Sequence, residues 1–115
     1  MDLKRIQRAR DFAERTGVYH FAYTAANAGA LTVTNAMACL TLDSTDGALT
    51  VTLPKVEQAA GLTYSFMCKT YSNAITIQDN DDSDDWTNIS LDAAQDGALL
   101  YSDGRKWWVL VDNYS

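Results

Sequence analysis

The residues best suited to chemistry form an acidic run, D-N-D-D-S-D-D, at positions 79–85. Asp79, Asp81 and Asp85 place carboxylates at alternating positions, and carboxylate oxygens at this spacing are the ligands that begin a calcium loop. The glycine that such a loop needs at its sixth position is an aspartate here, and the glutamate expected at its twelfth position is a serine. We therefore favour a solvated, self-repelling loop that discourages pairing between sheet edges. These three aspartates remain a weak calcium candidate, and we expect no bound metal.

The sequence contains few histidine and cysteine side chains. His20 is the only histidine, and Cys39 and Cys68 fit no metal or redox spacing. A catalytic cysteine–histidine pair would have to be completed across the fold, and nothing in the spacing supports one. We expect reduced thiols and a partly exposed strand histidine, with a single disulfide as the less favoured alternative.

Motifs of the common enzyme classes are also missing from the sequence. It contains no glycine-rich phosphate loop, no G-x-S-x-G turn and no helical pair of metal ligands. The sequence therefore predicts a protein that is not an enzyme and that uses no cofactor.

Aromatic residues are the remaining candidates for binding. Such side chains can stack on sugars, although they more often fill cores and subunit interfaces. The residues concerned are Trp86, Trp107, Trp108, Tyr64, Tyr71, Tyr101 and Tyr114.

Charge divides the chain into a basic arm and an acidic body. The protein has 115 residues, enough for one domain, and a formal net charge of -6. Five basic and three acidic residues lie in 1–15, whereas 16–115 hold four basic and twelve acidic residues. An arm of this composition suits an acidic protein surface better than nucleic acid, since its basic residues are interrupted by acids. No apolar run is long enough for a membrane helix, and no signal peptide is evident, so we expect a soluble protein made in a cytosol.

Most of the chain has the composition of strands. Residues 2–15 have a helical apolar period and predict a short arm, and 54–60 predict one helical turn. Val18–Thr24 has strand composition. From Leu31 onward the apolar period is two residues, and turn signals separate the segments. We place strands at about 31–34, 36–42, 48–53, 62–69, 74–78, 87–91, 97–102 and 106–111.

The final hairpin organises the rest. Ala98–Val111 reads as two apolar strands joined by a turn around Asp103 and Gly104. Because side chains alternate along a strand, Trp107 and Trp108 should point to opposite faces. One tryptophan can close the core, and the other needs a second surface, which we expect to be another copy of the chain.

Several segments taken in order resemble the small β domains of bacteriophage head fibres, capsid decoration proteins and tail fibres. The matching features are Val51–Pro54, the A-A-G at 59–61, N-A-I-T-I at 73–77, and the closing S-D-G-R-K-W-W-V-L at 102–110. The resemblance covers about residues 48–111. It implies an all-β fold, frequent trimerisation and a structural role on the virion surface. Trp86 departs from the pattern, and the N-terminal arm lies outside it.

These observations together predict an all-β protein, an antiparallel β-sandwich or barrel with a short N-terminal α-helical arm. Residues 1–30 would form the anchoring helix and connector, and residues 31–115 the β domain. We expect a phage virion structural protein, a capsid decoration or head-fibre protein on the capsid surface, made in the host cytoplasm. Its partners would be itself, as a homotrimer, and the major capsid protein or another virion protein, without nucleic acid or membrane. The alternative is a tail-fibre or tailspike module that binds host-surface carbohydrate.

Two sets of site residues follow from this interpretation. The trimer interface would contain Tyr101, Trp107 and Trp108. The capsid-anchoring residues would be Leu3, Lys4, Arg5, Ile6, Arg8, Arg10 and Phe12.

Overall fold

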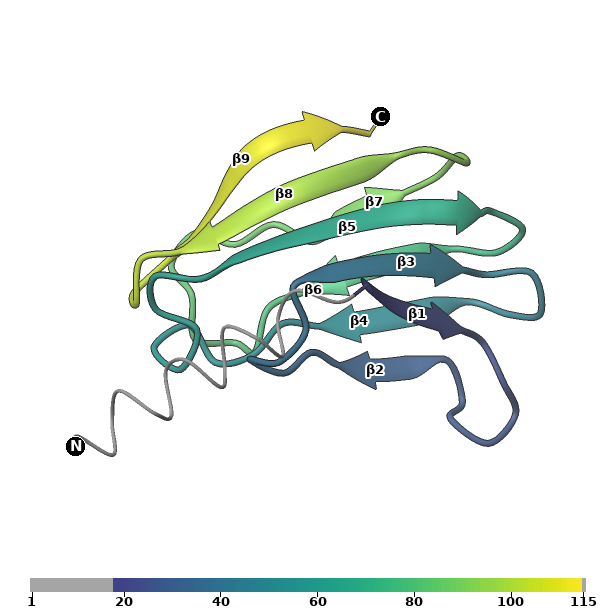
Figure 1. The fold of residues 1–115 in the computed structure, drawn as a ribbon, viewed down its shortest axis with the longest axis horizontal. Coiled ribbons are helices and arrows are strands. Elements are labelled where there is room, and N and C mark those ends of the chain that lie inside the picture. Colours follow the sequence, from purple (N-terminus) through teal and green to yellow (C-terminus); the bar gives the residue numbers. More distant parts are fainter. Residues whose placement is uncertain (1–17, 115) are drawn as a thin grey trace.

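The fold is a sandwich of two β-sheets (Figure 1). A computed structural model describes residues 18–114, and within that range every regular element is a strand. Sheet A has the order β1-β3-β5-β8-β9. Its strands are β1 (Val18–Ala22), β3 (Cys39–Asp43), β5 (Thr63–Thr70), β8 (Gly97–Ser102) and β9 (Trp107–Asn113). Sheet B has the order β2-β4-β6-β7. Its strands are β2 (Ala30–Thr32), β4 (Leu49–Thr52), β6 (Ile75–Gln78) and β7 (Ile89–Leu91).

The chain winds back and forth between the two sheets. Strands β1, β3 and β5 are parallel neighbours in sheet A, while β2, β4 and β6 are parallel neighbours in sheet B. Each return to a sheet therefore passes through a strand of the opposite sheet. Only the last three strands pair antiparallel, β7 with β6, β8 with β5, and β9 with β8.

The prediction of an antiparallel sandwich or barrel is wrong, because both sheets are mixed. Alternating burial along each strand shows that one face is covered, and it does so equally for parallel and antiparallel neighbours. Our prediction relied on short strands separated by frequent turn signals, a pattern that we took to exclude parallel strands joined by crossover helices. Here the opposing sheet covers one face of the parallel strands, and the other face meets solvent. The predicted helical arm lies outside the described residues.

The core lies between the sheets and follows the period of two. In β4 and β6, Leu49 pairs with Ile75 and Val51 with Ile77, and all four side chains are buried. Sheet A contributes inward side chains from β3, β5 and β8. The largest fully buried side chains are Tyr64, Phe66, Leu40, Leu42, Leu49, Leu53, Ile75, Ile77, Leu91, Leu100, Val33 and Val51.

Two buried serines connect loops to this core. Ser44 Oγ accepts hydrogen bonds from the backbone N–H groups of Ser72 and Asn73, both at 3.1 Å. Ser102 Oγ donates to the backbone oxygen of Val56 at 2.6 Å. Since an unpaired buried polar group costs about 1–3 kcal/mol, these bonds fix the loops in one arrangement.

The predicted strand positions agree closely with the observed ones from β3 onward. The segment 54–60, where we predicted one helical turn, contains a backbone hydrogen bond of the α-helical kind, which Ala59 N donates to Lys55 O four residues earlier at 3.1 Å. Between residues 18 and 114 there is no helix long and apolar enough to cross a membrane.

Candidate functional site

The hairpin of β8 and β9 is built around the side chain of Asp103. Its Oδ1 accepts the backbone N–H groups of Arg105 and Lys106, each at 2.8 Å. Gly104 has φ +95°, a conformation that costs glycine little and other residues more. The sequence D-G therefore sets the turn, as predicted, and the turn sets where β9 begins.

The two adjacent tryptophans point to opposite faces, which confirms that prediction. Trp107 is 3% exposed and packs edge-to-face on Tyr64, with the ring centres 5.6 Å apart. Trp108 is 46% exposed on the outer face of sheet A. One indole thus closes the core, and the other is available to a partner.

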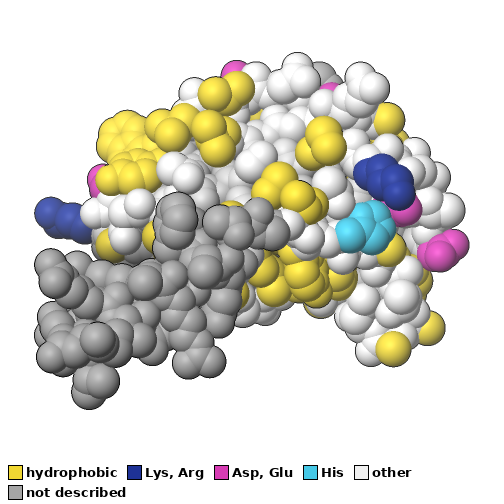
Figure 2. Space-filling view, in the orientation of Figure 1, with side chains coloured by type: hydrophobic (Ala, Val, Ile, Leu, Met, Phe, Trp, Pro, Cys, Tyr) yellow, Lys and Arg dark blue, Asp and Glu magenta, His cyan; other side chains and the backbone are white. Residues whose placement is uncertain are grey.

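Strand β9 carries an apolar surface that the other residues between 18 and 114 leave exposed. After Trp108, the side chains of Val109, Leu110 and Val111 are 41%, 53% and 56% exposed. We call these four residues the β9 ridge. In Figure 2 hydrophobic side chains gather at the upper left, where β8 and β9 lie in Figure 1. Within residues 18–114, β9 pairs with β8 alone, so its other edge also leaves backbone groups unpaired.

A shift in register lies within the β9 ridge. Leu100 pairs with Val109 but Leu99 pairs with Val111, so Leu110 is an extra residue in β9. Such a bulge bends the strand and breaks the simple alternation of faces. Val109 shares the face of the buried Leu100 and is nevertheless 41% exposed, so apolar side chains reach solvent on both faces of β9.

Electrostatic contacts hold Trp108 in place at the start of the ridge. Its Nε1 donates to Asp103 Oδ2 at 2.9 Å, and Lys106 Nζ lies 4.5 Å from the centre of its ring system. The indole N–H, followed by the backbone N–H groups of the turn, lowers the pKa of Asp103 below its usual value. An ionised Asp103 thus keeps the exposed indole in one orientation.

The predicted trimer-interface residues are therefore placed as follows. Tyr101 pairs with Trp108 across β8 and β9, and both lie on the outer face of sheet A. Trp107 lies in the core of its own chain. Tyr101 and Trp108 can contact a second chain, and their role in a trimer stays a prediction.

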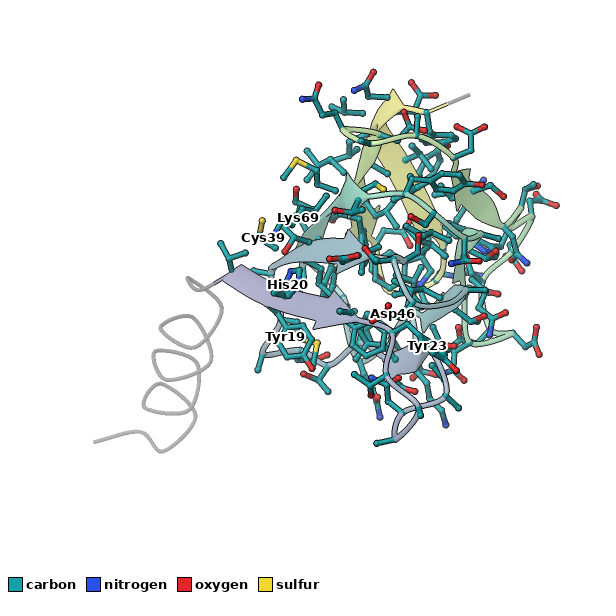
Figure 3. The ribbon with its side chains drawn as sticks, turned by 90° about the vertical axis from the view of Figure 1, so that its right-hand side faces the viewer. Tyr19, His20, Tyr23, Cys39, Asp46 and Lys69 are labelled. Atoms are coloured by element: carbon teal, nitrogen blue, oxygen red, sulfur yellow. The ribbon has the colours of Figure 1, made fainter. Side chains whose placement is uncertain are left out.

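A polar group with reactive side chains lies on the outer face of sheet A at its other edge. Val18 pairs with Cys39 and His20 with Thr41, so His20 and Cys39 share one face at diagonal positions. His20 Nδ1 lies 2.9 Å from Thr41 Oγ1. Figure 3 shows His20, Cys39 and Lys69 on this side of the molecule. No hydrogen bond within the described residues joins His20 to Cys39.

The carboxylate of Asp43 belongs to the same polar group. Hydrogen bonds from the side chain and backbone of Thr45 lower its pKa, and the charges of His20 and Lys69 contribute less.

The acidic run at 79–85 serves partly as a structural loop. Asp79 Oδ2 accepts the backbone N–H of Ser83 at 3.0 Å, and Asp82 Oδ2 accepts that of Val56 at 3.0 Å. Ser83 Oγ in turn accepts the backbone N–H of Trp107 at 2.9 Å. These bonds attach the run to the 54–60 turn and to β9.

The calcium candidate gains no support from this geometry. Asp81 and Asp85 are exposed and have φ values of +59° and +56°. Residues 18–114 contain no cluster of three or more histidine, cysteine or acidic side chains able to hold a metal ion.

The aromatic residues considered for sugar stacking are divided between the core and the surface, and Tyr101 and Trp108 are paired neighbours on the outer face of sheet A. Tyr64 and Trp107 are buried, whereas Tyr71 and Trp108 are exposed on different elements. The capsid-anchoring residues Leu3 to Phe12 lie outside the described residues. No family model, curated protein or solved structure matches this chain.

The sequence did not lead us to the exposure of Val109, Leu110 and Val111. We read 106–111 as an alternating strand with one inward and one outward face. The signal was present in W-W-V-L-V at 107–111, since five consecutive apolar residues cannot all be buried on a strand covered on one side.

Proposed function

We propose that this chain is a structural protein of a bacteriophage virion, a capsid decoration or head-fibre protein that assembles as a homotrimer. The observation that supports it is the β9 ridge, four consecutive apolar side chains between 41% and 56% exposed. Large apolar side chains exposed together on one edge strand are typical of a site of protein association. The order of matching segments, 48–111, supplies the phage assignment.

The energy of association comes from covering the ridge. Complete burial of a large apolar side chain is worth about 1.5–3 kcal/mol, and half-exposed side chains gain about half of that. Three chains that meet through Tyr101 and the ridge each bury this surface once. Trp108, held by Asp103, loses little freedom in the contact, which lowers the cost of association.

Anchoring is assigned to residues 1–15, with their five basic side chains. A trimer carries three such arms on one body. Since the second and third arms bind intramolecularly once the first is attached, the trimer's affinity for a capsid can exceed that of one arm by orders of magnitude. A decoration protein stabilises the assembled shell because it binds the lattice and not the free subunits.

The test uses capsids of the parent phage that lack this protein. The full chain is mixed with them, and bound protein is measured by co-sedimentation. We expect the full chain to bind and a truncation of 1–15 to remain trimeric but unbound. Binding by the truncated trimer would reject the anchoring role, and failure of the full chain to bind would reject the capsid assignment.

A further inference from the structure

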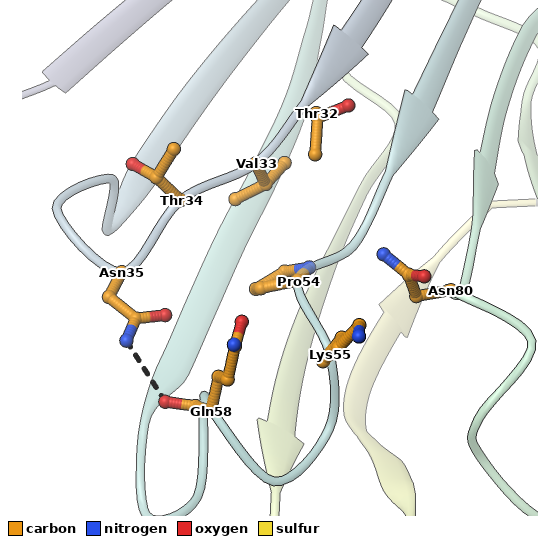
Figure 4. Close-up of a pocket in the computed structure, with 8 residues that line it drawn as sticks. All are labelled: Thr32, Val33, Thr34, Asn35, Pro54, Lys55, Gln58 and Asn80. Atoms are coloured by element: carbon orange, nitrogen blue, oxygen red, sulfur yellow. Dashed lines mark hydrogen bonds between the residues drawn. The ribbon is translucent and has the colours of Figure 1, made fainter.

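A pocket of about 330 Å³ opens at the ends of three parallel strands of sheet B (Figure 4). Strands β2, β4 and β6 end at Thr32, Thr52 and Gln78, and the segments that follow them form the walls. The volume is at the small end of the range for ligand pockets, about 300–1,000 Å³. Each of three successive passes of the chain therefore contributes to one concave site.

The walls of the pocket carry polar groups that pair with no residue between 18 and 114. Lys55 Nζ and the side-chain amide of Gln58 make no hydrogen bond or ion pair with any residue between 18 and 114, and neither do the hydroxyls of Thr32 and Thr34. Asn80 Nδ2 donates to the backbone oxygen of Leu53 at 3.4 Å, which leaves Asn80 Oδ1 for another donor. The site thus offers both donors and acceptors within one small volume.

The floor and the frame of the pocket are fixed. Val33 and Pro54 are buried and give it an apolar base. Asn35 Nδ2 donates to the backbone oxygen of Gln58 at 2.9 Å, which joins the loop after β2 to the turn after β4 (Figure 4). In the same view Gln58 lies on one side of Pro54, with Lys55 and Asn80 on the other.

The charges near the pocket decide among ligand classes. Lys55 is its one cation, while Glu57 and the acidic run at 79–85 adjoin it in a protein of net charge -6. An anion such as a phosphate would be repelled by these acidic side chains, and a single lysine would have to offset that repulsion. A wholly apolar ligand would displace water from the amides and hydroxyls that it covers and would not replace those hydrogen bonds.

We infer that this pocket binds a neutral saccharide of one or two rings. Sugar hydroxyls both donate and accept, and carboxamide and threonine side chains pair with both functions. The apolar base of Val33 and Pro54 suits the C–H face of a ring. The site lies on sheet B and shares no residue with the β9 ridge, so the inference does not depend on the proposed function. It also places sugar binding away from the aromatic residues that the sequence suggested for it.

The test is a titration of the ¹⁵N-labelled full chain followed by amide NMR. The probes are glucose, galactose, mannose and N-acetylglucosamine, each raised to roughly 50 mM, with N-acetylneuraminic acid as the anionic comparison. We expect at least one neutral sugar to shift the side-chain amide signals of Gln58 and Asn80, with a Kd on the order of 1 mM. N-acetylneuraminic acid should bind more weakly.

Variants then assign the binding to the pocket. Gln58→Ala and Lys55→Ala should each weaken the neutral sugar about tenfold, equivalent to about 1.4 kcal/mol. Glu57→Gln, on the same turn but outside the pocket lining, should leave the affinity unchanged. The inference is overturned if none of the four sugars shifts the pocket signals, if the acidic sugar binds more tightly, or if both alanine variants bind like the parent. The native mass of the protein plays no part in these outcomes.

Discussion

The indole N–H of Trp108 donates to the carboxylate of Asp103 at 2.9 Å across the turn that joins β8 to β9. The same carboxylate accepts two backbone N–H groups of that turn. One side chain thus shapes the hairpin and orients the largest exposed aromatic ring. The contact explains how an exposed tryptophan can be held ready for a partner without being buried in its own chain.

This contact predicts a pH dependence for the indole signal of Trp108. The pKa of Asp103 is lowered in the folded protein, first by the indole N–H and then by the backbone N–H groups. A lowered folded pKa means that the carboxylate contributes stability above its unfolded pKa of about 3.9 and loses it as pH falls through the folded value. We expect the Nε1–H cross-peak of Trp108 to stay constant from neutral pH down to the ordinary aspartate range and to move only below it. Asp103→Asn should abolish the transition, and a midpoint above the ordinary value would contradict the geometry.

The two cysteines should differ in reactivity. Cys68 is 1% exposed, and burial, followed by the nearby charge of Asp96, raises the pKa of its thiol. Cys39 is partly exposed on the outer face of sheet A. Because the thiolate is the reactive species and must reach the reagent, we expect one thiol per chain to react with a disulfide reagent such as DTNB under native conditions and the second only on unfolding. Cys39→Ser should remove the native reaction. Two equally fast thiols would contradict this structure.

Two glycines with the same backbone conformation provide a matched test of the loop that follows β1. Gly29 and Gly61 have φ values of +70° and +82°. A Cβ on Gly29 would clash with the backbone oxygen of Ala48 and lie 2.8 Å from Tyr23 Cδ2, whereas one on Gly61 would meet nothing within 4 Å. Gly61→Ala should therefore lower the free energy of unfolding only by the cost of placing an alanine at a positive φ, about 1–2 kcal/mol.

Gly29→Ala should cost roughly 1–3 kcal/mol more, because the clash must be relieved by shifting backbone. Chemical denaturation of both variants measures the difference in the free energy of unfolding. Equal losses would show that the close approach of Gly29 to Ala48 is absent in solution.

Local features of the fold, its turns and the alternation of buried side chains, were predictable from the sequence. Which strands pair, and in which direction, was not. The turn at Asp103–Gly104 and the alternation from Leu40 through Val51 to Ile77 each depend on neighbours in the chain. Parallel pairing of β1 with β3, or β2 with β4, depends on which distant strands meet, and one-sided alternation is the same for either direction.

The candidate surfaces show the same division. The alternation of side chains along a strand was enough to predict that Trp107 and Trp108 point to opposite faces. The approach of His20 to Cys39 depends on the register of β1 with β3. The pocket at Thr34, Pro54 and Asn80 depends on three strands that end together in sheet B. Neither arrangement leaves a spacing pattern in the chain.

The native mass of the purified full chain, measured by light scattering over a range of concentrations, tests the central claim most directly. We expect a mass three times that of the chain for the parent protein and for Thr50→Lys, whose exposed side chain lies on sheet B. Leu110→Lys, which places a charge in the β9 ridge, should be a monomer. A parent protein that stays monomeric at every concentration, or a Leu110→Lys variant that remains a trimer, would contradict assembly through the ridge.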